Sequence, residues 1–164
     1  MSKELSKLSV GDAAPDFTMP STVRGRYTLS EEAGKGPVLL YFYVMNFGHT
    51  CTWYIADMIE ARPRFQDLGV TMVHVNPASV EEHKEWVETT GSPFEHISDV
   101  DQEVSKRYGA IVTNEKAPKV LGYTNREFYL VDEKMIIRYI WCAEMPADAI
   151  PIAALLDELK AALR

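Results

Sequence analysis

The chain has 164 residues, of which 46% are hydrophobic and 25% charged, and this ordinary globular composition excludes a disordered or collagen-like protein. Its net charge of −7 would repel nucleic-acid phosphates and anionic lipid, and no run of Lys or Arg concentrates positive charge locally. We therefore expect one globular domain over residues 1–164 that binds neither nucleic acid nor a membrane.

The N-terminal sequence and the cysteine count predict a cytoplasmic protein. The segment MSKELSKLSVGDAAPDF has no apolar region of the kind that a secretory signal needs, and the longest apolar run, residues 38–45, is too short to span a bilayer. Two cysteines, Cys51 and Cys142, are too few for a disulfide scaffold. In a reducing compartment, any pairing of these thiols would belong to a reaction cycle.

The first half of the chain predicts a hairpin followed by a strand and a long helix. Segments 16–19 and 26–29 would form the two arms of the hairpin, and Ser30 would cap a turn of helix directly after it. The run 38–44, rich in aromatic and β-branched residues, predicts a buried strand. Apolar residues then recur at helical spacing from residue 50 to residue 68.

The second half continues the alternation and closes with a hairpin and a helix. Ser79 and Glu82 stand in capping-box positions, and Gly91 would end the helix that Ser79 begins. Strands that alternate with helices favour an α/β, thioredoxin-like fold: a central mixed β-sheet flanked by helices, with an N-terminal hairpin. The elements predicted here, in order, are strand 70–76, helix 79–91, strand 94–98, helix 101–108, loop 113–125, hairpin 126–142 and helix 147–162.

Cys51 is the candidate nucleophile. It falls in the first turn of the predicted helix 50–68, with Thr50 or His49 at the cap, directly after a buried strand. Unpaired N–H groups and the helix dipole favour negative charge at that position, and therefore favour the nucleophilic thiolate. The alternative is a small, inert core residue, which is the commoner role of a free cysteine.

Arg126 is the candidate partner of this thiol. It opens a strand after a polar loop, and a four-residue turn at 132–135 would place it opposite Trp141. That end of the sheet is where helices that follow strands begin, so the guanidinium could stabilise the Cys51 thiolate and orient an oxygen substrate. The alternative is a solvated charge at a strand end.

Four motifs, taken in this order, resemble the peroxiredoxins, the alkyl hydroperoxide reductase and thiol-specific antioxidant family. They are the opening GDAAPDF, a strand that leads to a Cys-Thr pair, the segment DVDQEVSKRYG and the strand REFYLVD. The likeness runs from Val10 to about Trp141. It implies a thiol peroxidase with Cys51 as the peroxidatic cysteine, Arg126 as the active-site arginine and no bound cofactor.

The segment before the cysteine departs from the family's pattern P-x-x-x-T-x-x-C. Here it reads VMNFGHTC, so that Val44 stands at the proline position and Gly48 at the threonine position. In the family the proline shields the thiolate, and the threonine hydroxyl bonds to the thiolate and the peroxide. The candidate substitute donors are His49, Thr50, Thr52 and Tyr43.

Two further features carry weaker expectations. The same hairpin register pairs Cys142 with Asn125, beside Arg126, so Cys142 is either a resolving cysteine on the active-site side or a plain core or strand-end cysteine. His74, in an apolar strand, is expected to be a satisfied core residue. No histidine pair shows metal-ligand spacing, so we expect no metal site.

The resemblance implies reduction of hydrogen peroxide or organic hydroperoxides through a cysteine sulfenic acid. The implied partners are a thiol reductant, such as a thioredoxin-like protein or a low-molecular-weight thiol, and a second copy of the chain, with Trp53 and Tyr54 near the contact. Two alternatives stay open. One is a thiol-disulfide oxidoreductase or redox sensor, although no C-x-x-C is present. The other is a non-catalytic binding protein with the same fold.

Overall fold

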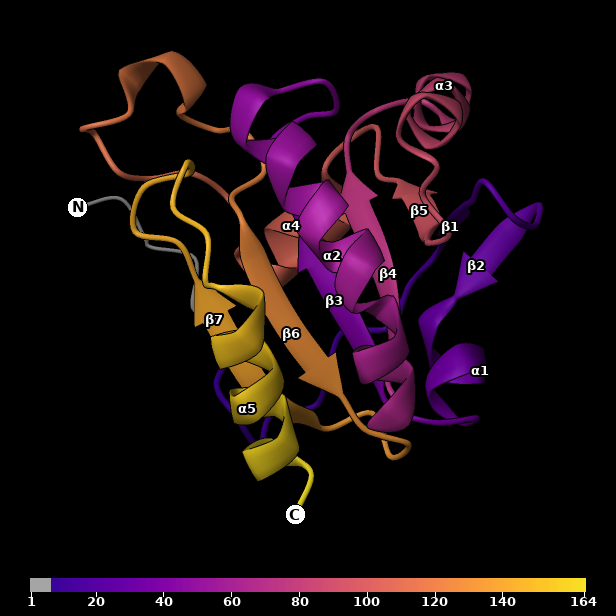
Figure 1. Cartoon of the computed structure of the whole chain (residues 1–164). Helices are drawn as coiled ribbons and strands as arrows, with labels where there is room; N and C mark the ends of the chain where they lie inside the picture. The colour runs from indigo at the N-terminus through magenta and orange to yellow at the C-terminus, as the bar shows by residue number, and fades with distance from the viewer. Residues whose placement is uncertain (1–6) are drawn as a thin grey trace.

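The computed structural model describes residues 7–164 and contains a five-stranded mixed sheet in the order β5-β4-β3-β6-β7 (Figure 1). β3 and β4 are parallel, as are β4 and β5, whereas β6 runs antiparallel to both β3 and β7. The strands of this sheet are β3 (Val38–Phe42), β4 (Thr71–Asn76), β5 (Glu95–Ser98), β6 (Glu127–Val131) and β7 (Ile137–Cys142).

Helices cover both faces of the sheet, as the sequence predicts. α2 and α5 lie on the near face in Figure 1, and α4 lies behind the sheet. A separate hairpin of β1 (Thr18–Pro20) and β2 (Arg26–Thr28) precedes the sheet and its helices in the chain. The helices are α1 (Leu29–Ala33), α2 (His49–Asp67), α3 (Val80–Thr90), α4 (Glu103–Tyr108) and α5 (Ile152–Ala162), with a short 3₁₀ turn at Pro118–Val120.

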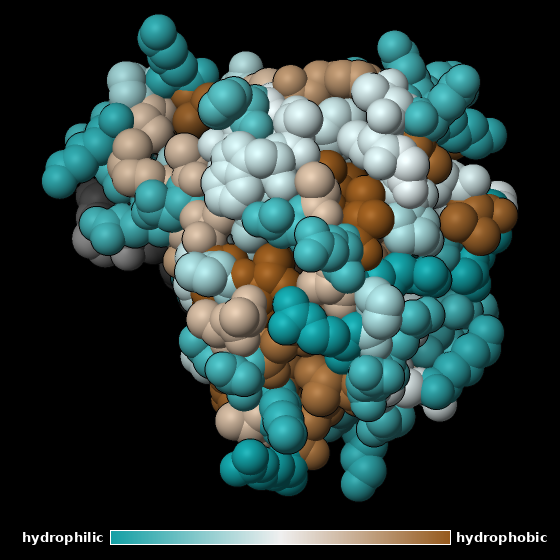
Figure 2. Space-filling view, viewed as in Figure 1, coloured by the Kyte–Doolittle hydropathy of each residue, from teal (hydrophilic) through white to brown (hydrophobic). Residues whose placement is uncertain are grey.

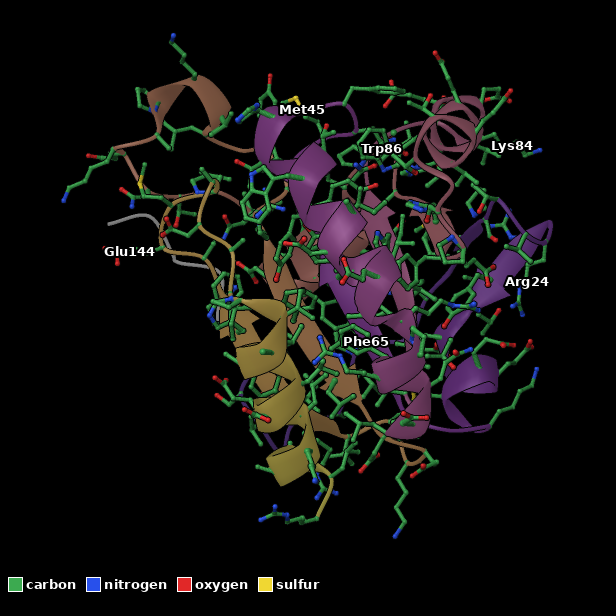
Figure 3. All side chains as sticks on the ribbon, in the orientation of Figure 1. Arg24, Met45, Phe65, Lys84, Trp86 and Glu144 are labelled. Carbon is green, nitrogen blue, oxygen red and sulfur yellow. The ribbon has the colours of Figure 1, made fainter. Side chains whose placement is uncertain are left out.

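Side-chain alternation along the strands builds two cores, one on each face. On β3, Leu39 and Tyr41 pack with α2 and α5, and Leu40 and Phe42 pack on the other face with α1 and α4. Phe65 of α2 belongs to the first core (Figure 3). On the outer surface over α2 and α5, apolar patches alternate with hydrophilic side chains (Figure 2).

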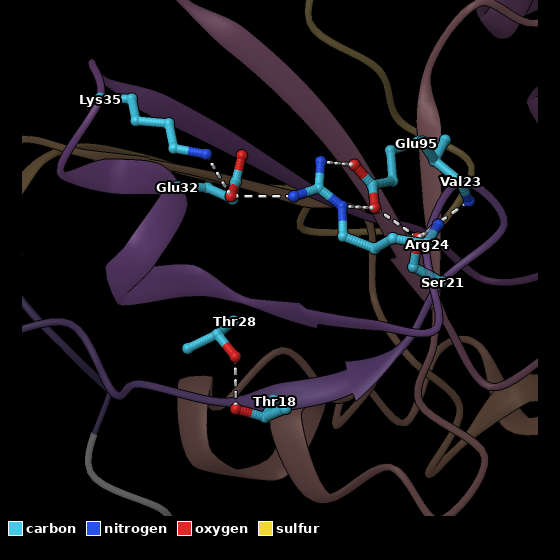
Figure 4. Close-up of polar contacts among 8 residues, drawn as sticks. All are labelled: Thr18, Ser21, Val23, Arg24, Thr28, Glu32, Lys35 and Glu95. Atoms are coloured by element: carbon cyan, nitrogen blue, oxygen red, sulfur yellow. Dashed lines mark hydrogen bonds and ion pairs between the residues drawn. The ribbon is translucent and has the colours of Figure 1, made fainter.

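The N-terminal hairpin is tied to the edge strand β5 by charge. Arg24 donates to both carboxylate oxygens of Glu95 at 2.8 and 2.9 Å and pairs with Glu32 at 2.8 Å (Figure 4). Ser21 also donates to Glu95, and it forms a backbone bridge with Ile97 of β5. The hairpin therefore covers an edge that would otherwise expose unpaired backbone groups.

The predicted helix caps are confirmed for α3 but not for α1. Ser79 accepts a hydrogen bond from the Glu82 amide at 3.1 Å, and Gly91 ends α3 with a φ of 71°, as predicted. Ser30 is not the cap of α1: Thr28 holds that position, and the Ser30 amide donates to Asp16 at 2.9 Å. Within residues 7–164, no helix is long and apolar enough to cross a membrane.

The C-terminal hairpin has a different register from the predicted one. Val131 pairs with Ile137, whereas the predicted register pairs it with Ile136. A bulge between Leu130 and Val131 then shifts the remaining pairs by one more residue. Trp141 consequently lies opposite Phe128, and the Arg126 carbonyl accepts from the Ala143 amide. The expected pairing of Arg126 with Trp141 is therefore wrong by two residues.

Candidate active site

Cys51 lies in the first turn of α2, buried against the sheet with only 5% of its surface exposed. The N-cap of α2 is Gly48, not His49 or Thr50, because the Thr52 amide and hydroxyl both donate to the Gly48 carbonyl, at 2.9 and 2.7 Å. Within the described chain, no side chain caps this helix start. The sulfur therefore sits where helix N–H groups and the helix dipole favour an anion.

Arg126 reaches the same sulfur from the start of β6. Its Nη2 donates to Cys51 Sγ at 3.4 Å, although the two residues are 75 positions apart in the chain. The Arg126 Nε donates to the Pro146 carbonyl at 3.2 Å, and its Nη1 donates to the Tyr41 hydroxyl. The guanidinium also lies over the ring of Tyr54, at 5.6 Å from its centroid. All three donor nitrogens of Arg126 thus have a partner.

Arg126 is only 1% exposed, so the reading of a solvated strand-end charge is wrong. Burial on its own would lower the pKa of Arg126, but interactions with Tyr41 and Cys51 outweigh it and raise that pKa above its ordinary value. The guanidinium therefore stays charged beside the sulfur. A buried cation bonded to a sulfur is placed to interact with negative charge that forms there.

A cavity of about 480 Å³ opens in front of Cys51 and Arg126. Its walls come from three segments, residues 44–51, 116–120 and 145–147, and are mainly apolar. The charged side chains at this cavity, besides Arg126, are those of Lys116 and Lys119, both exposed. The arrangement offers an apolar chamber with one buried and two exposed cations around a thiol.

The predicted substitute donors are spread around the site without bonding to the sulfur. His49 and Thr50 line the cavity, whereas the Thr52 hydroxyl is used on the Gly48 carbonyl. The Tyr43 hydroxyl donates to Asn46 Oδ1 at 2.5 Å. Among residues 7–164, Arg126 provides the one hydrogen bond to Cys51 Sγ.

Cys142 lies on the opposite face of the sheet from Cys51. It pairs with Glu127 across β6 and β7. Its side chain therefore lies on the same face of the sheet as Tyr129, which packs in the core that includes α4. The residue is exposed at the sheet edge, but its thiol is partly enclosed, and burial together with the Glu127 carboxylate raises the pKa of Cys142 to about 11. The expectation that Cys142 lies on the active-site side is wrong, because Cys142 pairs with Glu127, whose side chain points to the opposite face of the sheet from that of its neighbour Arg126.

Sequence reasoning missed Tyr41. Its hydroxyl accepts from Arg126, and its ring lies in the core between Tyr43 and Phe128. The available signal was the alternation along β3, which places Tyr41 on the face that α2 covers. That signal gives the face but not the partner, which comes from β6.

A buried polar network, also missed, supports the loop between β3 and α2. Asn46 accepts from Tyr43 and donates to His83 Nδ1 at 3.1 Å. His96 lies 3.3 Å from the Tyr43 hydroxyl and 2.9 Å from Ser92 Oγ. This network positions the residues that precede Cys51 against α3 and β5.

His74 is fully buried, and neither of its ring nitrogens has a partner within the described chain, so the expectation of a satisfied core histidine is wrong. Burial lowers the pKa of His74, of His83 to about 4 and of His96 to about 3. The three rings are therefore neutral at ordinary pH. Over residues 7–164, no group of three or more potential ligands is arranged to hold a metal ion.

Residues 10–140 match the AhpC/TSA family. The chain is 34% identical over 145 residues to a peroxiredoxin of Thermoplasma volcanium, with 85% of this chain and 66% of that protein covered. It is 35% identical over 141 residues to the selenocysteine-containing peroxiredoxin PrxU of Peptoclostridium acidaminophilum, with 80% of this chain and 66% of that protein covered. The chain thus spans about two thirds of the length of these relatives.

A solved structure gives the same picture of the fold. A cysteine-to-serine mutant of PrxQ from Xylella fastidiosa superposes with a TM-score of 0.83 at 19% identity, covering 97% of this chain and 99% of that one. The predicted thioredoxin-like fold is confirmed. The matches favour a thiol-dependent peroxidase over a thiol-disulfide oxidoreductase, a redox sensor or a non-catalytic binding protein.

Proposed function

This chain belongs to the AhpC/TSA family of peroxiredoxins, and from that premise we propose that it is a peroxidase in which Cys51 is the peroxidatic cysteine and Arg126 its activating partner. The observation that carries the proposal is the 3.4 Å contact between Arg126 Nη2 and Cys51 Sγ at the wall of an apolar cavity. A fixed guanidinium can bind both the thiolate and an incoming peroxide oxygen.

The reaction follows from this geometry. The Cys51 thiolate attacks the terminal oxygen of a hydroperoxide, an S–O bond forms and the O–O bond breaks. The sulfur is oxidised to a sulfenic acid, and the leaving alkoxide takes a proton from water to become an alcohol, or water when the substrate is hydrogen peroxide. Arg126 holds the negative charge that moves from sulfur to oxygen during this step.

Two thiols then return the enzyme to its starting state. The first condenses with the sulfenic acid and releases water, and the second breaks the resulting disulfide. Because Cys142 faces away from Cys51, we assign the resolving thiol to a separate molecule, either a thioredoxin-like protein or a low-molecular-weight thiol. This cycle needs a reducing compartment, which supports a cytoplasmic location.

The cavity supports a role for organic hydroperoxides beside hydrogen peroxide. Its apolar walls can bind the carbon body of such a substrate while the peroxide group meets Cys51 and Arg126. Large apolar side chains are also exposed on the two loops beside the cavity, and this surface would suit a second copy of the chain. They are Met45, Phe47, Leu121 and Tyr123, together with Trp53 on α2.

Peroxide consumption by the purified protein, with dithiothreitol as reductant, tests the proposal. The wild-type protein and Cys142→Ser should consume hydrogen peroxide and cumene hydroperoxide at similar rates, whereas Cys51→Ser should consume neither. Retained turnover in Cys51→Ser, or loss of turnover in Cys142→Ser with an intact fold, would contradict the assignment. Sedimentation velocity of the reduced protein tests whether two copies of the chain associate, and a monomer would contradict the proposed dimer.

A further inference from the structure

The loop of residues 44–48, between β3 and α2, forms one wall of the cavity in front of Cys51. Val44, Met45 and Gly48 line this cavity. A Cβ built on Gly48 would lie 3.8 Å from Cys51 Sγ, so the backbone of the loop runs directly beside the sulfur. The Gly48 carbonyl also accepts the first hydrogen bonds of α2. A shift of this loop would therefore move both the cavity wall and the helix turn that carries the thiol.

The backbone of this loop has little support of its own. Within the described chain, residues 44–47 make no hydrogen bond to another backbone group. Phe47 adopts a φ of 63°, in the left-handed region that is costly for a residue other than glycine. Such a conformation persists only where its surroundings hold it in place. One support is Trp86 of α3, which meets the Phe47 ring edge-on with centroids 4.8 Å apart. The loop is therefore held by its side chains.

The main polar support is Asn46, the buried residue of this loop, which is 6% exposed. Its Oδ1 accepts from the Tyr43 hydroxyl at 2.5 Å and from Asn76 Nδ2 of β4 at 3.3 Å. Its Nδ2 donates to His83 Nδ1 of α3 at 3.1 Å and to Glu82 Oε2 at 3.5 Å. One side chain thus ties the loop to β4 and to α3.

The bond between Asn46 and His83 has a fixed direction. The carboxylate of Glu82 only accepts, and an amide nitrogen only donates, so Asn46 Nδ2 is the donor and His83 Nδ1 the acceptor. Burial lowers the pKa of His83 to about 4, so the ring is neutral at ordinary pH and this acceptor is available. A second acceptor at position 46 would face His83 Nδ1 without a proton between them, and the contact would be lost.

We propose that Asn46 is a positioning residue of this active site, and that its hydrogen bond to His83 holds the cavity wall and the start of α2 in the geometry that reacts with peroxide. The inference rests on the peroxidase function proposed above. The residues that line the cavity do not include Asn46, so it acts through the loop without touching the substrate. A displacement of about 1 Å at an active site can cost about 100-fold in rate. A loop released at Asn46 should therefore react slowly even in a folded protein.

The test reverses donor and acceptor across this contact at about pH 8, where His83 is neutral. Asn46→Asp puts a second acceptor against His83 Nδ1. It should slow the second-order reaction with hydrogen peroxide, followed by stopped-flow tryptophan fluorescence, by about 100-fold. Adding His83→Gln to Asn46→Asp should recover at least about tenfold of this rate, because the glutamine amide can turn its N–H groups to the carboxylate. Glu82 is present in both proteins, so its repulsion of the new carboxylate cancels in the comparison.

Asn46→Ala separates this bond from a general effect of the substitution, and it keeps the test open should Asn46→Asp not fold. It should react slowly as well, and His83→Gln should not rescue it, because alanine offers the glutamine no partner. Ser105→Ala is the matched control on the other face of the sheet. Ser105 is fully buried, and its hydroxyl donates to Asp99 at 2.8 Å. This variant also loses a buried hydrogen bond, but it should react at the wild-type rate. Urea unfolding should show that the variants are folded in the assay.

Hydrogen exchange of the Thr52 amide gives a readout that does not need activity. This amide donates to the Gly48 carbonyl at 2.9 Å, so it should exchange faster in Asn46→Asp and in Asn46→Ala, and more slowly again when His83→Gln is added to Asn46→Asp. Wild-type rates or wild-type exchange in these folded single variants would overturn the inference. Rescue of Asn46→Ala by His83→Gln, or failure to rescue a folded Asn46→Asp, would overturn it too. An inactive wild-type protein would instead refute the peroxidase proposal, and the exchange rates would still decide whether Asn46 holds the loop.

Discussion

Acid should destabilise this protein through His83, because the folded state keeps that ring neutral. His96 contacts both His74 and His83 where α3, β4 and β5 meet, with ring centroids 4.8 Å apart for His74 and His96 and 5.4 Å apart for His83 and His96. Burial lowers the pKa of His83 to about 4, whereas a histidine in an unfolded chain titrates near about 6.5. A charged His83 ring would lie against His96 in a site enclosed by protein.

The sign follows from proton counting. Between about pH 6.5 and pH 4 the unfolded chain binds a proton at His83 and the folded protein does not, so stability is full above this range and falls as the pH falls through it. At about pH 5 the loss at His83 alone is about 2 kcal/mol relative to pH 8. His96, with a pKa lowered to about 3 by burial, adds to the loss in the same direction.

Urea unfolding of wild type and His83→Gln at both pH values isolates this contribution. The glutamine oxygen can accept the bond that Asn46 now donates to His83 Nδ1 at 3.1 Å, so the variant should fold at pH 8. The wild-type protein should lose about 2 kcal/mol more than the variant on going to pH 5. Carboxylates titrate in both proteins, and their effect cancels in the comparison. Equal losses in the two proteins would refute the reasoning.

Two other perturbations bear on the site. Arg126→Gln should slow the reaction with peroxide by at least about 100-fold. It should also lower the free energy of unfolding by about 2 kcal/mol, because a buried guanidinium with three hydrogen bonds is lost. Equal stopped-flow rates for the variant and the wild-type protein would remove Arg126 from the mechanism. Brief exposure to one equivalent of peroxide should add one oxygen atom to the Cys51 peptide and none to the Cys142 peptide, because Cys142 stays protonated with a pKa of about 11. Equal oxidation in a mass spectrum of the two peptides would contradict this.

Local patterns in the sequence determine the elements of this protein and the place of its thiol. Hydrophobic period and capping residues depend on neighbours a few positions apart, so the strands, α3 with its Ser79 and Gly91 ends, and the position of Cys51 at the start of α2 were predictable. The peroxiredoxin motifs gave the pair Cys51 and Arg126 as well. The error in the cap of α2 was a matter of one or two residues.

Tertiary structure decided the surroundings of that thiol. The burial of Arg126 and its bond to Cys51 join residues 75 positions apart, and the side of the sheet that Cys142 occupies depends on the register of β6 and β7, with its turn and bulge. Tyr41 shows the limit most clearly: alternation along β3 gives its face, but its hydroxyl meets Arg126 only because β6 pairs beside β3. Such contacts depend on strand order and packing, which no short window of sequence contains.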